Sequence, residues 1–150
     1  MANANRYAFS RKELADIYEK LVLSHELAGG YESVKFNSRN KKFRKLVKDI
    51  ELDFKRFKTI NELNKVLQHE KQKPEAMTKN ICWFLDSQQN SIKSVLKLLR
   101  NSAAHAHIMR SKRNVIWYSM EHQYRKQTKF RLQMKATDFW RFVEQAKNSK

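Results

Sequence analysis

The sequence predicts a mainly α-helical protein, and three observations lead to this expectation. The 150 residues include only 2 Gly and 1 Pro, too few for a sandwich or barrel with many tight turns. The 41% hydrophobic and 11% aromatic residues can build a core and argue against wholesale disorder. Apolar residues recur mostly at helical spacing. We expect a single domain over residues 1–150, a small bundle of four to five helices with a short β-hairpin before the C-terminal helix.

The first helix is predicted to begin after Ser10. Ser10 and Glu13 have the spacing of a capping box, in which each side chain satisfies a free backbone donor at the helix start. Gly29 and Gly30 are expected to end the helix. Its apolar stripe consists of Leu14, Ile17, Tyr18, Leu21 and Val22.

Two further helices are predicted before Pro74. One follows a polar loop through Asn40 and carries an apolar stripe from Phe43 to Phe57. The next begins with a capping box at Thr59 and Glu62, and it must end before Pro74 because proline disfavours a helical neighbour.

The middle of the chain is predicted to be helical from about Thr78 to Leu99. The apolar pattern covers Ile81 to Leu85, pauses in the polar stretch Asp86 to Ser91 and resumes at Ile92, so one long helix and two shorter ones both fit. Cys82 lies in the first apolar part, where a small buried side chain is a better interpretation than a nucleophile.

The C-terminal third is predicted to form the hairpin and the last helix. Residues 115–120 and 130–134 alternate in character as strands do, with a connection around 121–129. Trp117 and Tyr118 then point to opposite faces; we expect both to pack in the core, although one could stack on a base. Thr137 is expected to cap the final helix.

The charge indicates a polyanionic partner. The formal net charge of +17 attracts nucleic acid, an acidic protein or an anionic membrane face. The excess is concentrated in the second half, because between Ile92 and Met134 the only acidic residue is Glu121.

Several classes of protein are excluded. The single cysteine rules out an intrachain disulfide framework and a Cys-rich zinc site, and it fits a reducing cytoplasm. No apolar run approaches the roughly 20 residues that cross a bilayer, and residues 1–10 lack the apolar stretch of a secretory signal. We therefore expect a cytoplasmic protein without a membrane partner.

No cofactor or metal is expected. The chain has no Gly-rich phosphate loop, no HExxH motif, no nucleophile elbow and no acidic cluster. His105 and His107 could ligate a metal in principle, but two residues apart on a helix they would point to nearly opposite faces.

One short run carries a specific signal. Residues 98–106 read Leu-Leu-Arg-Asn-Ser-Ala-Ala-His-Ala, which closely resembles the R-x4-H motif of the HEPN family, commonly Arg-Asn-x-x-Ala-His. The resemblance implies a small helical bundle of the kind found in prokaryotic toxin, abortive-infection and CRISPR-associated systems. It also implies a metal-independent endoribonuclease in which Arg100 and His105 are catalytic and Asn101 is the polar residue beside the Arg.

These residue types suit RNA cleavage. Histidine moves protons near neutral pH, and the always-protonated arginine stabilises the negative charge of the transition state. Five residues turn an ideal helix through roughly 140°, so Arg100 and His105 would not lie side by side on it. A bend near Arg100, its long side chain or a second subunit must close the gap, and the resemblance implies a homodimer with a composite site.

The sequence departs from the family pattern at one position. Some toxin members have a Tyr two residues after the motif His, where this chain has His107, so modification by an antitoxin does not carry over. His107 is a candidate phosphate ligand. Members often place an acidic residue against the motif, and Asp86 and Glu51 are candidates that the sequence does not separate.

The resulting hypothesis is a HEPN-type endoribonuclease that forms a 2′,3′-cyclic phosphate by attack of the 2′-hydroxyl, in a toxin or phage-defence role with a possible inhibitory partner. The alternatives are a basic nucleic-acid-binding module without catalysis and a protein that binds an acidic partner such as an antitoxin. The candidate RNA contacts are Lys97, His107, Arg110, Lys112, Arg113, Arg125, Lys126 and Arg131.

Overall fold

A mixed β-sheet organises the protein. The computed structural model describes residues 9–70 and 79–150. Their five strands lie in the order β1-β2-β5-β4-β3. The strands are β1 (Asp53–Phe57), β2 (Ile81–Leu85), β3 (Ile108–Arg113), β4 (Val115–Tyr124) and β5 (Gln127–Lys135). β1 and β2 are parallel, and the other neighbouring pairs are antiparallel. The predicted mainly α-helical bundle is therefore wrong, because helices and a five-stranded sheet share the core.

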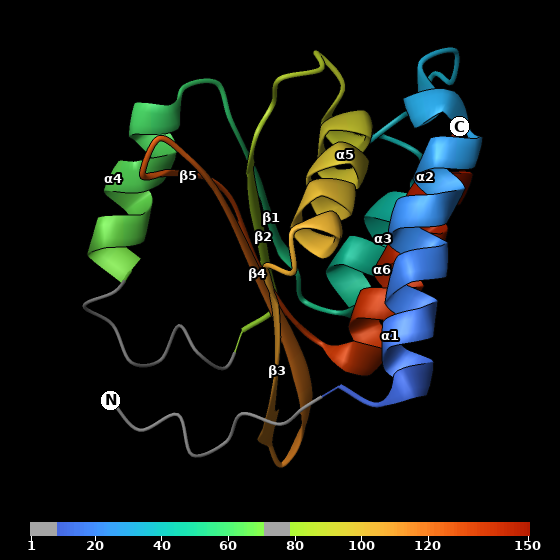
Figure 1. Cartoon of the computed structure of the whole chain (residues 1–150). Helices are drawn as coiled ribbons and strands as arrows, with labels where there is room; N and C mark the ends of the chain where they lie inside the picture. Colours follow the sequence, from blue (N-terminus) through green and yellow to red (C-terminus); the bar gives the residue numbers. More distant parts are fainter. Residues whose placement is uncertain (1–8, 71–78) are drawn as a thin grey trace.

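Helices cover the two faces of the sheet unequally (Figure 1). The helices on one side are α1 (Arg11–Ile17), α2 (Ser24–Leu27), α3 (Lys41–Asp49), α5 (Ser91–Ala104) and α6 (Ala136–Asn148). On the other side lies α4 (Ile60–Glu70), which packs on Phe57, Ile81 and Trp83. The larger core lies between the sheet and the first group of helices and includes Phe84, Phe130 and Leu132.

The N-terminal helical segment forms as the sequence predicts. The capping box of Ser10 and Glu13 is present, and a π-helical stretch η1 (Tyr18–Leu23) joins α1 to α2. Gly29 and Gly30 have φ of +60° and +69° in the 3₁₀ turn η2 (Gly29–Tyr31). Such angles favour glycine, so this pair turns the chain out of the helix. Leu14 and Tyr18 are exposed, in contrast to their predicted place in the buried stripe.

Two predicted helical stretches are strands. Helix α3 ends at Asp49, and Glu51 has φ of +51°, so the chain turns and residues 53–57 pair with β2. Ile81–Leu85 is an interior strand whose first four residues are buried. A strand covered on both faces has a continuous apolar run, which periodicity does not distinguish from a buried helix.

Other predictions are confirmed. Thr59 caps α4, and β4 and β5 form the expected hairpin. Both Trp117 and Tyr118 are buried.

The sequence missed one strand and misplaced one cap. The basic edge strand β3 was not predicted, and α6 begins after Lys135 rather than at Thr137. Pro74 and Thr78, the predicted helix boundaries, lie outside the described residues. In the ranges that the structure describes, every helix is too short or too polar to cross a bilayer.

Candidate active site

The motif residues lie at the C-terminal end of α5. The helix is anchored by buried apolar side chains such as Ile92, Val95 and Leu99. Arg100 and Asn101 occupy the part of α5 nearest its end and are half-buried, and the helix stops at Ala104. The core side of α5 therefore fixes the direction in which the motif points.

The chain leaves α5 through a Schellman turn. The N–H of Ala106 donates to the carbonyl of Ala103 at 3.2 Å, and the N–H of His107 donates to the carbonyl of Ser102 at 2.7 Å. These bonds close the turn around Ala106, whose φ is +57°. The turn directs His107 back toward His105.

Three histidines gather at this turn. The ring centroids of His105 and His107 are 6.0 Å apart. His122 of β4 joins them, at 6.2 Å from His105 and 5.8 Å from His107. The sequence argument that His105 and His107 face apart is wrong, because the helix ends before His105. We call His105, His107 and His122 the histidine cluster.

The environment of His122 differs from that of its neighbours. His105 and His107 are exposed, whereas His122 is half-buried and its Nδ1 is buried without a hydrogen-bond partner among the described residues. Burial lowers the pKa of His122, and His107, Lys129 and His105 lower it further through charge repulsion. The register of β4 against β5 also shifts between His122 and Gln123. Such a bulge redirects side chains and is common beside active sites.

Arg100 is held by an acidic residue that the sequence did not identify. Its Nε and Nη2 lie 2.7 and 2.6 Å from Oε1 of Glu26 in α2. Its Nη1 donates to Oδ1 of Asn101 at 3.1 Å. Among the described residues, these contacts use three of the five guanidinium N–H donors. The other two, one on Nη1 and one on Nη2, can donate hydrogen bonds to a phosphate.

The two acidic candidates from the sequence lie elsewhere. Asp86 pairs with Arg56 at 3.1 Å and accepts a hydrogen bond from Ser94 at 2.6 Å. Glu51 is exposed in the turn after α3. Glu26 could not be selected from sequence spacing, since 74 residues separate it from Arg100.

His25 and Lys97 lie close to Arg100. Burial lowers the pKa of His25; the charge of Glu26 opposes this effect, and the charges of Arg100, Lys97 and Lys147 add to it. The ring of His25 meets Tyr31 edge-on, with centroids 5.4 Å apart.

We call Arg100, Asn101 and Glu26 the arginine group.

The histidine cluster and the arginine group are separate sets of contacts. Within the part of the chain that the structure describes, no hydrogen bond or ion pair joins Arg100 to His105. Arg100 contacts Asn101, and the ring of His105 lies near that of His107. Both sets lie at the C-terminal end of α5.

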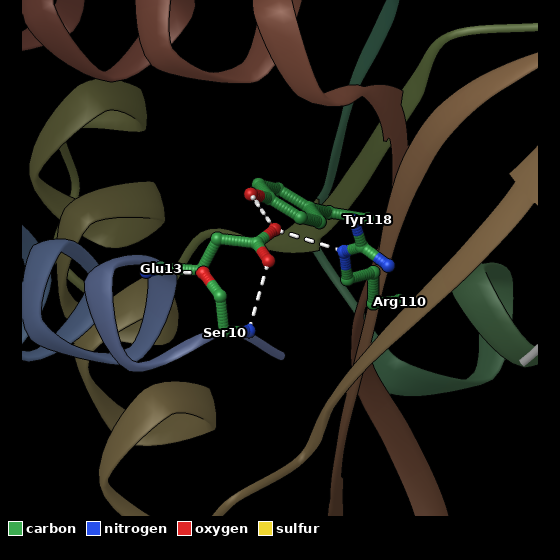
Figure 2. Close-up of polar contacts among 4 residues, drawn as sticks. All are labelled: Ser10, Glu13, Arg110 and Tyr118. Carbon is green, nitrogen blue, oxygen red and sulfur yellow. Dashed lines mark hydrogen bonds and ion pairs between the residues drawn. The ribbon is translucent and has the colours of Figure 1, made fainter. Parts of the chain in front are cut away.

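The predicted RNA-binding residues fall into different environments. Arg110 is part of the fold: its Nε lies 2.9 Å from Oε2 of Glu13, which also accepts a hydrogen bond from Tyr118 at 2.8 Å (Figure 2). Arg131 donates to the carbonyl of Leu132 and to Gln133. The exposed members are Lys97, His107, Lys112, Arg125 and Lys126. Arg113 ends strand β3.

The tip of the β4–β5 hairpin is basic and aromatic. Arg125 and Lys129 approach the exposed ring of Tyr124, at 5.2 and 5.4 Å from its centroid. The charge of Lys129 also lowers the pKa of His122. This tip therefore places positive charge beside the histidine cluster.

The metal-ligating side chains of the described residues do not form a group of three or more that could hold a metal ion. No set of three or more His, Cys, Asp or Glu side chains in residues 9–70 and 79–150 is arranged to hold one. Cys82 is fully buried, and burial raises the pKa of its thiol, so it is unsuited to act as a nucleophile.

Comparison with known proteins identifies the family. The model of the family described as HEPN pEK499 p136 matches residues 15–149. No curated protein and no solved structure matches the chain. The matched range includes the helix end with Arg100 and His105, as well as Glu26 and His122. HEPN domains are generally associated with ribonuclease activity. The chain belongs to the HEPN pEK499 p136 family.

Proposed function

We propose that this protein is a metal-independent endoribonuclease of HEPN type. One observation carries the proposal: the Arg-Asn-x-x-Ala-His motif lies at the end of α5, with Arg100 oriented by Glu26 and His105 exposed. A positioned cation and an accessible imidazole are what RNA cleavage without a metal requires.

The reaction is an attack of the RNA 2′-hydroxyl on the adjacent phosphorus. It forms a 2′,3′-cyclic phosphate and releases the 5′-hydroxyl of the next nucleotide. Arg100 binds the phosphate through its free Nη1 and Nη2 donors, and His105 moves a proton. Asn101 positions Arg100, because its Oδ1 accepts a hydrogen bond from Nη1.

RNA reaches the site over a basic surface. The exposed cations Arg125 and Lys126 contact the backbone, with Lys97 and Lys112 as further contacts, and Tyr124 offers a face on which a base can stack. The ring of His107 lies 6.0 Å from that of His105 between centroids, which supports His107 as a phosphate contact in this proposal. The ion pair of Arg110 with Glu13 assigns that arginine to the fold instead.

Two copies of the chain form the active unit. A composite site would combine the arginine group of one subunit with the histidine cluster of the other, since no hydrogen bond or ion pair joins the two sets among the residues described in one chain. A twofold dimer creates two such sites at once. An unrestrained ribonuclease is toxic, which favours a toxin or phage-defence role with an inhibitory partner.

The test is incubation of the purified protein with total RNA in EDTA. Wild type should cleave, and Arg100→Ala and His105→Ala should each lose cleavage by about 10²-fold or more, the size of a general-acid or charge-stabilising contribution. His69→Ala is the matched control, because His69 is exposed on α4 across the sheet. If all four proteins bind RNA in a salt-sensitive way and none cleaves, the chain is a binding module and the proposal is wrong.

A further inference from the structure

The proposed cleavage requires two proton transfers. The 2′-hydroxyl loses a proton as its oxygen bonds to phosphorus, and the departing 5′-oxygen gains one as its bond to phosphorus breaks. These two oxygens lie on opposite sides of phosphorus in an in-line reaction, so two separate groups serve the two transfers better than one. The sequence motif supplies only one histidine for them.

We propose that His122 and His105 form an acid–base pair, in which His122 takes the proton of the 2′-hydroxyl and His105 gives a proton to the 5′-oxygen. This inference rests on the proposed function. The two rings come from different elements, β4 and the turn after α5, and they lie nearly parallel at 24° with centroids 6.2 Å apart. Rings at this separation can serve the two sides of one bound phosphate.

The surroundings of His122 suit a base. Its Nδ1 is buried without a hydrogen-bond partner among the described residues, so RNA does not reach this atom. The proton of the 2′-hydroxyl therefore goes to Nε2, and the neutral ring carries its hydrogen on Nδ1. The cationic groups around the ring are Lys129 from β5 and, when protonated, His105 and His107 from the α5–β3 connection. Neutral His122 is therefore available to accept a proton near neutral pH.

The backbone supports the position of His122. The bulge after it interrupts the regular alternation of β4 at this residue. Its partner across the sheet is Phe130, which is fully buried. The ring of His122 therefore lies on the face of the sheet that α5 and α6 cover, near the end of α5, and stacks against His105.

The proton balance of the cycle is complete. His122 starts neutral and ends protonated, while His105 starts protonated and ends neutral. The products are the cyclic phosphate and the free 5′-hydroxyl, and exchange with water restores both rings. No metal or other reactant enters.

The experiment compares kcat, KM and their pH dependence on one RNA oligonucleotide in EDTA for wild type, His122→Asn and His122→Gln. Asn and Gln keep polarity but do not titrate. We expect kcat to fall by about 10²-fold or more in both variants, while KM changes by less than about threefold. The acid limb of the kcat/KM profile, which reports the protonation of His122, should disappear. His69→Asn should leave both constants and the profile unchanged.

A merely structural role of His122 gives a different result. Thermal melting identifies a variant that fails to fold, and the variant that melts like wild type is used. If that variant keeps kcat within about threefold and retains the acid limb, the assignment of His122 is wrong while the ribonuclease proposal stands. If wild type itself cleaves no RNA, both proposals fall.

Discussion

His122 is the residue whose protonation the fold affects most directly at the candidate site, through burial first and neighbouring charges second. Burial and the nearby His107, Lys129 and His105 all lower its pKa. Because the folded pKa lies below that of the unfolded chain, about 6.5, the unfolded state binds the proton more tightly. The neutral ring therefore stabilises the fold above that unfolded value, and this contribution is lost as the pH falls through the folded pKa.

His105→Ala should raise the pKa of His122. Removal of the neighbouring imidazole removes a source of charge repulsion, so the pKa should move upward toward the ordinary histidine value. NMR titration of the imidazole resonances measures it directly, with His69→Ala as the control. An unchanged or lower His122 pKa in His105→Ala would show that the two rings do not interact in solution.

Only part of the candidate site could be predicted from the sequence. The motif could be recognised without knowledge of the fold, because Arg100, Asn101 and His105 lie within six consecutive residues. Glu26 and His122 could not be found in this way, because the return of the N-terminal helix and of β4 brings them to the end of α5. His107 was visible as a histidine, but its orientation depends on where the helix stops.

At the scale of elements, Glu13 joins the first helix to the sheet. Its carboxylate accepts hydrogen bonds from the backbone of Ser10, from Tyr118 and from Arg110 (Figure 2). Burial raises the pKa of Glu13, but these hydrogen bonds outweigh it, and the net effect is a lowered pKa. The charged carboxylate is thus favoured in the fold.

Glu13→Gln should destabilise the protein by about 1–3 kcal/mol at pH 7, the typical cost of losing hydrogen bonds to a charged group. Because the folded pKa lies below the unfolded value of about 4.3, the benefit is present above that value and is lost as the pH falls through the folded pKa. Urea unfolding of both proteins at pH 7 and in acid measures the difference. A gap that widens in acid would contradict this account.

The turn at Ala106 stores backbone strain next to the histidine cluster. Its φ of +57° is a conformation in which an L-residue costs roughly 1–2 kcal/mol more than glycine. Ala106→Gly should therefore raise the free energy of unfolding by up to about 1 kcal/mol, since a more flexible unfolded chain offsets part of the gain. Urea denaturation is the measurement, and a destabilised variant would rule out the Schellman turn at this position.

The strands were harder to predict than the helix ends. Local signals such as Ser10 with Glu13 and Gly29 with Gly30 act through neighbouring residues, and the structure contains both. Strand β2 pairs with β1 and β5, which are remote in sequence, and its burial on both faces removes the alternation that marks a strand. The mixed sheet therefore depends on pairing between remote segments, which local sequence patterns do not reveal.

At the scale of the whole molecule, the central question is whether one site draws on two chains. Mixing inactive Arg100→Ala with inactive His105→Ala protein in equal amounts tests this. If subunits exchange freely, half of the dimers are mixed and each has one intact composite site, so about a quarter of wild-type cleavage should return. Light scattering confirms the dimer and the exchange. Failure of the exchanged mixture to regain cleavage would place the arginine group and the histidine cluster of one site in the same chain.

The most direct test of the account is the chemistry of the cleaved ends. A labelled RNA oligonucleotide is incubated in EDTA with wild type and with His105→Ala, beside an oligonucleotide that carries a single 2′-deoxy nucleotide at the cleaved position. We predict a 2′,3′-cyclic phosphate from wild type alone and no cut at the 2′-deoxy position, because the attacking hydroxyl is missing there. Cleavage of the 2′-deoxy substrate, or the same products from His105→Ala, would contradict a HEPN-type ribonuclease built on Arg100 and His105.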